Sequence, residues 1–317
     1  MPEAIRKVNV IGHLNPDTDS ICSAIAYAYL KNKLGNTDIY EARRAGSVNR
    51  ETAFALKHFG FAEPELITTV TPQIKDCEVQ KQDGIEAGMS LFAAWSRMRE
   101  TGTDTLCITD EQDNLGGLIA VKDIANANLD IFDTEVIAES ATSYANIVST
   151  LNGEMLLGDP EATVTEGSVR VGTTPEMMED TVKKGDLVLV TNRYETQQFA
   201  VECDASCIVV CCGAHVSPQV MASAKRHGCA IIATPYDTYA ASRLICMSIP
   251  VSAKMHRDGI VKLSVNTSID DAKKTIASSR HRFFPVIDED GKYKGLVSTP
   301  SLLTAKKKHA IVVAHNA

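Results

Sequence analysis

A histidine and two aspartates lie within seven residues of one another in the run G-H-L-N-P-D-T-D-S at residues 12–20. The imidazole of His13 and the carboxylates of Asp17 and Asp19 could converge on one divalent cation. A mixed set of nitrogen and oxygen ligands favours Mn²⁺ or Co²⁺, with Mg²⁺ as a further candidate, since Mg²⁺ prefers an all-oxygen site. The alternative is a simple turn in which the aspartates cap a helix and His13 bonds locally.

The flanking residues predict a strand before this run and a helix after it. Residues 8–11 are mostly apolar, and small or apolar residues recur at helical spacing over 21–28. Ser20 is the predicted N-cap, and Gly35 follows the predicted helix end. The run therefore lies between the carboxyl end of a strand and the amino end of a helix, where open α/β sheets bind their ligands.

Composition narrows the class of protein. The chain has 317 residues, of which 44% are hydrophobic, and a net charge of −8; this length predicts two or more domains. Lys and Arg are dispersed, which argues against nucleic acid as a partner. Without a signal peptide or a membrane-spanning stretch, we expect a cytoplasmic protein with no membrane partner. The nine cysteines form no C-x-x-C pair and are predicted to be reduced, buried thiols.

Two segments of the chain resemble each other at an offset of 178 residues. The matched positions are Ser90 with Ser268, 108–111 with 286–289, and 117–119 with 295–297. Each copy predicts a capped helix, a strand, a polar turn, a second strand and a short helix. This spacing predicts a pseudo-symmetric pair with another domain inserted between its members.

The inserted segment, 131–250, has its own alternation of strands and helices. Strands are predicted at 185–190, 205–210 and 230–233, and a helix at 218–227. Strands that alternate with helices indicate a parallel sheet. The expected fold class is therefore α/β multidomain.

The 12–20 run, continued by R-A-G-S-V-N-R-E-T at 44–52, resembles family II inorganic pyrophosphatases of the DHH phosphoesterase superfamily. The resemblance covers about the first sixty residues and implies a partial DHH-type parallel sheet. It also implies that His13, Asp17 and Asp19 are Mn²⁺ or Co²⁺ ligands at a two-metal site that hydrolyses pyrophosphate to two phosphates.

The repeated segments resemble a pair of CBS domains, which bind adenine nucleotides in the cleft between the copies. Asp123 stands where that family has its ribose-binding aspartate. The second copy keeps the hydroxyl residue, Ser298, but has Ser301 in place of the aspartate, so one nucleotide site is expected. Arg280 and Arg282 either meet phosphates as bidentate donors or lie on the solvated surface.

The inserted segment resembles a DRTGG domain. The expected division is 1–68 (N-terminal part of the DHH domain), 69–130 (first CBS domain), 131–250 (DRTGG domain), 251–308 (second CBS domain) and 309–317 (return strand). In this arrangement the CBS pair interrupts the DHH-type sheet and itself contains the DRTGG domain. The same order is found in nucleotide-regulated pyrophosphatases, which respond to AMP, ADP, ATP and diadenosine polyphosphates. CBS pairs dimerise, so the resemblance also implies a homodimer.

The last five residues of the sequence are V-A-H-N-A. An apolar run before them is expected to form a strand beside the first strand of the chain. The family has V-D-H-N-E in place of V-A-H-N-A. Ala314 and Ala317 cannot bind a cation, and the later D-H-H motif is not in the sequence, so no complete catalytic set is expected. The chain is then either a truncated piece or a degenerate relative, inactive alone. Three functions remain: part of a nucleotide-regulated inorganic diphosphatase, a non-catalytic adenine-nucleotide sensor, or another DHH-type phosphoesterase acting on oligonucleotides or cyclic dinucleotides.

Overall fold

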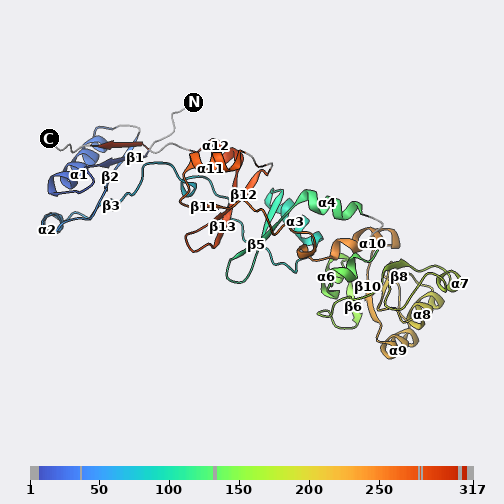
Figure 1. Cartoon of the computed structure of the whole chain (residues 1–317). Helices are drawn as coiled ribbons and strands as arrows, with labels where there is room; N and C mark the ends of the chain where they lie inside the picture. Colours follow the sequence, from blue (N-terminus) through green and yellow to red (C-terminus); the bar gives the residue numbers. More distant parts are fainter. Residues whose placement is uncertain are drawn as a thin grey trace. The chain divides into compact units, whose positions relative to one another are not determined.

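The computed structural model describes residues 7–35, 38–130, 134–277, 279, 281–305 and 309–312. The chain divides into two compact units, which are drawn in the colours of the sequence in Figure 1. The first takes its described residues from 1–81, 261–290 and 294–317, and the second comprises 82–260 and 291–293. Both contain helices and strands, which confirms the α/β multidomain fold class.

A parallel sheet in the first unit joins the two ends of the chain. Its strand order is β14 (His309–Val312), β1 (Lys7–Ile11), β2 (Ile39–Arg44) and β3 (Glu65–Leu66). Val8 pairs in register with His309 on one side and Tyr40 on the other. Figure 1 shows β14, in red, beside β1, in blue. The prediction that residues near 309 form a strand beside the first strand is confirmed.

Helix α1 (Thr18–Lys33) begins earlier than the sequence predicts. Asp17, not Ser20, is the N-cap, and its carboxylate accepts a hydrogen bond from the amide of Ser20. Ser20 itself is buried in the first turn. Aspartate and serine are both good N-cap residues. The N-cap is Asp17 because its side chain reaches the Ser20 amide, three residues later. Helix α2 (Arg50–Phe59) is capped in the same way by Asn49.

The repeat predicted from the sequence is confirmed element by element. In the second unit the elements are α3 (Leu91–Thr101), β4 (Thr105–Thr109), β5 (Leu115–Ala120) and α4 (Val121–Leu129). Their counterparts are α11 (Ile269–Ile276), β12 (Phe283–Ile287), β13 (Tyr293–Ser298) and α12 (Thr299–Leu303). Each of the four begins 178 residues before its counterpart, as the matched positions predict. In the first unit, β11 (Leu263–Ser264) pairs in parallel with β12, and the short helix η1 (Ile74–Asp76) adds Ile74 to the same core.

The second unit also contains a five-stranded sheet of order β6 (Glu154–Leu157), β10 (Ala230–Ala233), β9 (Cys207–Val210), β8 (Leu187–Val190) and β7 (Val169–Val171). Four strands are parallel, as predicted, and β6 is antiparallel to β10. The remaining elements are α5 (Val136–Glu139), α6 (Tyr144–Thr150), α7 (Pro175–Met178), α8 (Tyr194–Glu202), α9 (Pro218–His227), α10 (Thr238–Leu244), η2 (Ile245–Ser248) and η3 (Val251–Ala253).

Both faces of this sheet are covered, because alternate residues along each strand bury against opposite cores. In β8, Leu187 and Leu189 join the core that contains α6 and η2. Val188 and Val190 join a second core with α7, α8 and α9. A strand that is buried on both faces reads as a continuous apolar run, which is why the sequence located β8, β9 and β10 well.

The nine cysteines are free thiols, as expected. The prediction that they are buried is wrong for Cys22 and Cys212, which are exposed, and three others are half-buried. Cys22 lies on the exposed side of α1, although its neighbours Ile21 and Ala24 are buried, and Cys212 follows the buried run that ends at Cys211. Among the described residues, no helix has both the length and the apolarity needed to cross a bilayer.

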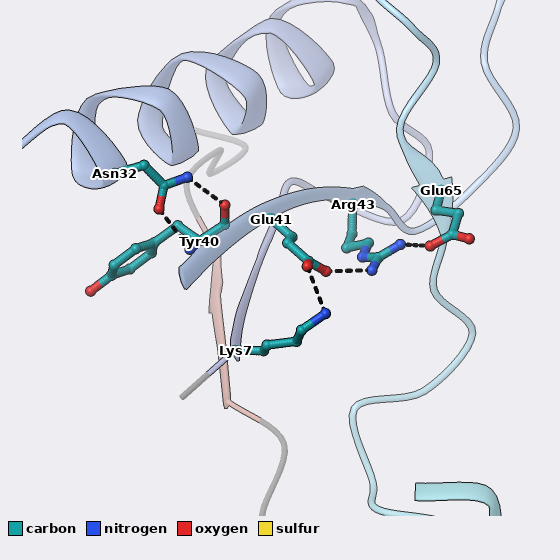
Figure 2. Close-up of polar contacts among 6 residues, drawn as sticks. All are labelled: Lys7, Asn32, Tyr40, Glu41, Arg43 and Glu65. Carbon is teal, nitrogen blue, oxygen red and sulfur yellow. Dashed lines mark hydrogen bonds and ion pairs between the residues drawn. The ribbon is translucent and has the colours of Figure 1, made fainter. Parts of the chain in front are cut away.

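Ion pairs link the three parallel strands β1, β2 and β3. Figure 2 shows Lys7 on β1 and Arg43 on β2 on either side of Glu41, with Glu65 on β3 paired to Arg43. Lys7 Nζ lies 3.0 Å from Glu41 Oε1, and Arg43 Nη2 lies 2.6 Å from Glu41 Oε2. The Lys7 ammonium, supported by Arg43, holds the pKa of Glu41 below its ordinary value of 4.5, although partial burial opposes this.

This arrangement predicts a pH-dependent stabilisation of the sheet. Because the pKa of Glu41 is lowered in the folded chain, its stabilising contribution is complete above pH 4.5 and disappears as pH falls through the folded pKa. Hydrogen-exchange protection of the β2 amides in Glu41→Gln should therefore lie below that of the wild type at pH 7, and the gap should narrow at more acidic pH. Glu51→Gln, at the exposed start of α2, is the control. A gap that is constant from pH 7 to pH 3 contradicts the prediction.

Candidate functional site

Two side chains of the 12–20 turn lie next to each other, in the loop between β1 and α1. His13 Nε2 is 3.4 Å from Asp17 Oδ1, and the same oxygen accepts the Ser20 amide at 2.9 Å. The Ser20 hydrogen bond, with a smaller contribution from His13, holds the pKa of Asp17 below its usual value. The turn therefore presents an ionised carboxylate next to an imidazole, a donor pair that suits Mn²⁺ or Co²⁺.

Asp19 lies in the first turn of α1, where its Oδ1 is 3.4 Å from the Ser23 hydroxyl. In the part of the chain that the structure describes, no three His, Cys, Asp or Glu side chains lie close enough to hold a metal ion. The structure thus brings His13 and Asp17 together without adding Asp19 to the cluster. The capping role considered for Asp17 is confirmed, and the metal-binding role of the three residues stays a prediction.

Close packing holds this turn in place. A Cβ at Gly12 would overlap the buried Ser20 hydroxyl, so only glycine lets α1 approach the end of β1 this closely. A Cβ at Gly46 would likewise overlap the Leu14 carbonyl. The hydroxyls of Thr18 and Thr52 lie 3.0 Å apart, which joins the start of α1 to the start of α2. The second half of the resembling motif, 44–52, therefore packs against the first half.

Gly12→Ala should destabilise this part of the chain, because the added methyl group overlaps Ser20. Overpacking of this kind costs about 1.5 kcal/mol. The measurement is hydrogen-exchange protection of the β1 amides, and Gly88→Ala, where an added Cβ meets nothing within 4 Å, is the matched control. Unchanged protection in Gly12→Ala contradicts the close approach.

A second candidate site lies at the start of α4, in the second unit. Asp123 Oδ2 accepts the Ala120 amide at 2.9 Å, and Asp123 Oδ1 lies 3.0 Å from His256 Nε2. The Asp123 side chain is 15% exposed and that of His256 58% exposed. The residue predicted to bind ribose therefore already has a partner for each carboxylate oxygen.

Nothing in the sequence pattern indicated His256 as the hydrogen-bond partner of Asp123. The main chain of His256 pairs with Leu118 on β5 through two hydrogen bonds, of 2.8 and 3.0 Å, and so brings a segment 133 positions away to Asp123. A Cβ at Gly117 would lie 2.9 Å from the His256 carbonyl. The glycine pair 116–117 inside a strand was the one available signal, because strand glycines often mark a close approach of another backbone.

The other predicted nucleotide-binding residues lie in or near the second repeat. The Ser298 hydroxyl caps α12 by accepting the Ser301 amide at 3.2 Å, and the two hydroxyls are 2.9 Å apart. Arg282 is exposed, and its carbonyl accepts the Thr299 amide. Arg280 lies outside the described residues, as do Ala314 and Ala317. The nucleotide roles of these residues stay predictions.

The loops that follow β8 and β9, at 191–193 and 211–213, lie at the carboxyl edge of the five-stranded sheet. Arg193 is the N-cap of α8, directly after β8. Cys212 and Gly213 follow β9 with positive φ, and their amides donate to the carbonyls of Tyr236 and Thr234. These bonds join the loops after β9 and β10 at the edge where parallel sheets bind ligands.

Comparison with known proteins agrees with this organisation. The DRTGG domain family matches residues 146–248, and the CBS domain family matches 251–308. The CBS and DRTGG domains of the regulatory region of the Clostridium perfringens pyrophosphatase, solved with the activator diadenosine tetraphosphate, superpose with a TM-score of 0.67. That match is 31% identical and covers 71% of this chain and 99% of the other.

Curated relatives cover almost the whole chain. The cobalt-dependent inorganic pyrophosphatase of Clostridium perfringens is 34% identical over 98% of this chain and 56% of its own length. The probable manganese-dependent inorganic pyrophosphatase of Thermotoga maritima is 27% identical over 99% of this chain and 57% of its own length. The chain thus spans about half the length of these relatives.

The chain combines CBS and DRTGG domains with a small parallel α/β sheet that carries a histidine–aspartate turn. The chain belongs to the family II inorganic pyrophosphatases of the type that contains CBS and DRTGG domains.

Proposed function

We propose that this chain supplies the nucleotide-binding regulatory module, and one metal-binding turn, of a manganese- or cobalt-dependent inorganic pyrophosphatase. Its domains would be those expected from the sequence: 1–68, 69–130, 131–250, 251–308 and the strand from 309. The observation that carries the proposal is the 31% identity between this chain and the CBS and DRTGG domains of a regulatory region that was solved with diadenosine tetraphosphate. The adenine nucleotides AMP, ADP, ATP and diadenosine polyphosphates would be its ligands.

The metal would be held by His13 and Asp17, with Asp19 as the third ligand. Their nitrogen and oxygen atoms suit Mn²⁺ and Co²⁺, and the lowered pKa of Asp17 keeps its carboxylate ionised. When two cations are bound, they supply hydroxide and clamp the phosphates. Three ligands from one turn would hold at most one cation, so we expect no pyrophosphate turnover by these 317 residues alone.

Titration with Co²⁺, followed by its visible absorption, tests the metal-binding turn. The wild type should bind Co²⁺, and His13→Ala should weaken binding at least tenfold, because it removes the imidazole ligand. His58→Ala, on the exposed side of α2, should bind like the wild type. Equal affinity in wild type and His13→Ala would remove the metal-binding role from the proposal.

A second candidate, a nucleotide sensor without catalysis, is favoured by one observation. Asp17 Oδ1 already caps α1, and among the described residues no third metal-binding side chain joins His13 and Asp17. The same titration separates the candidates, because a pure sensor binds no Co²⁺ at this turn.

We also propose that the chain forms a homodimer through its CBS domains. Trp95 on α3 and Leu129 on α4 are 36% and 73% exposed, which leaves apolar side chains available on these helices. Sedimentation velocity should then show a species of twice the mass of the 34.3 kDa chain. A monomer at micromolar concentration, with and without AMP, contradicts this proposal.

A further inference from the structure

The Asp123 carboxylate is engaged before any ligand arrives. One oxygen accepts the Ala120 amide, and the other lies 3.0 Å from His256 Nε2. The first contact belongs to the start of α4, since Asp123 is the third residue of that helix. The second comes from a segment far along the chain and has no part in forming the helix. A ligand that needs the carboxylate therefore meets His256 first.

Hydrogen bonds hold the main chain of His256 in place, whereas its ring is mostly exposed. Two backbone hydrogen bonds hold residue 256 against Leu118, and Gly117 admits this close approach. The imidazole is 58% exposed, whereas the Asp123 side chain is only 15% exposed. Rotation of the His256 side chain would uncover Asp123 without disturbing β5. Removal of the ring should therefore leave the fold unchanged.

We propose that His256 is an internal competitor for the ribose site, whose imidazole occupies the Asp123 carboxylate until ribose hydroxyls displace it. The inference rests on the proposed function, since it takes Asp123 as the residue that binds the nucleotide ribose. His256 then sets the nucleotide affinity of the chain: the Asp123–His256 hydrogen bond must break, or be shared, whenever a ribose binds.

The size of this effect follows from the exposure of the pair. A hydrogen bond to an ionised carboxylate is stronger than a neutral one, but water weakens it where one partner is mostly exposed. Loss of the competing bond should tighten nucleotide binding about fivefold, a change of roughly 1 kcal/mol. The gain depends on Asp123 and on the ribose hydroxyls, because His256 competes with those hydroxyls for the Asp123 carboxylate.

Calorimetric titration of the full chain with AMP tests the proposal through a double-mutant cycle. His256→Ala should bind AMP about fivefold more tightly than the wild type. His256→Gln, whose amide can still donate to Asp123, should stay close to the wild type. In an Asp123→Ala background, His256→Ala should have no effect. With 2′,3′-dideoxyadenosine monophosphate, which lacks the ribose hydroxyls, His256→Ala should gain nothing.

Each outcome decides one point. Weaker or unchanged AMP binding by folded His256→Ala overturns the competitor role and leaves the proposed function standing. A gain that persists in the Asp123→Ala background also overturns it, because His256 would then act elsewhere. Absence of AMP binding in the wild type and in His256→Ala refutes the proposed nucleotide site, and the competitor role with it. Circular dichroism and thermal unfolding confirm that each variant is folded.

Discussion

Asp123→Ala should weaken AMP binding by about 30-fold, or roughly 2 kcal/mol, because hydrogen bonds between ligand hydroxyls and an ionised carboxylate are among the stronger ones. The Asp123 side chain is 15% exposed, so water screens it poorly. Isothermal titration calorimetry of the folded variants measures the change. The affinity for 2′,3′-dideoxyadenosine monophosphate should change little, because that ligand has no ribose hydroxyls that could donate hydrogen bonds to Asp123.

Two variants control for the structural role of Asp123. Asp123→Asn keeps an oxygen for the Ala120 amide but loses the charge, so its affinity should lie between those of the wild type and Asp123→Ala. Asp130→Ala removes an exposed carboxylate at the other end of α4 and should bind AMP normally. If Asp123→Ala binds AMP as tightly as Asp130→Ala does, Asp123 does not bind the ribose.

Asp186→Ala should produce the largest loss of stability. Asp186 is 2% exposed and lies directly before β8. Its two oxygens accept the amides of Ser168 and Lys183, each at 2.8 Å, and Arg170 Nε lies 3.6 Å away. Without the carboxylate, two amides lose their partners, one of them buried, and about 3 kcal/mol of stability should be lost with them.

Because the chain has two units, global unfolding does not report on this site alone. Hydrogen exchange of the β8 amides does, and a loss of about 3 kcal/mol should lower their protection roughly a hundredfold. Asp180→Ala, at an exposed position in the same domain, is the matched control and should change protection little. If the β8 amides exchange in Asp186→Ala as in Asp180→Ala, the Asp186 carboxylate does not support the sheet.

Local patterns explain which elements could be predicted from the sequence. The helix at 218–227 and the strand at 230–233 are found at the expected residues. Ser217 caps that helix, and Gly228 ends it in a left-handed conformation. Cap residues and apolar runs therefore marked the boundaries of this helix and of the strand that follows it. The 178-residue repeat likewise predicted each helix and strand of the second copy, because equivalent residues form equivalent elements.

Contacts between distant residues could not be predicted in this way. The spacing of His13 and Asp17 is local, and the structure brings the two residues together. His256 reaches Asp123 from 133 positions away through backbone pairing with β5, which leaves almost no mark in the sequence. The antiparallel strand β6 was missed for a similar reason, since its place depends on pairing with β10. The N-cap of α1 was misplaced because Asp17 and Ser20 offer the same local signal.

The proposed function requires that this chain senses adenine nucleotides, and calorimetric titration of the full chain with AMP and with diadenosine tetraphosphate tests this claim. We predict saturable binding of at least one of the two, with a Kd below about 1 mM, equivalent to roughly −4 kcal/mol. A folded chain that shows no binding of either nucleotide at millimolar concentration would contradict the claim.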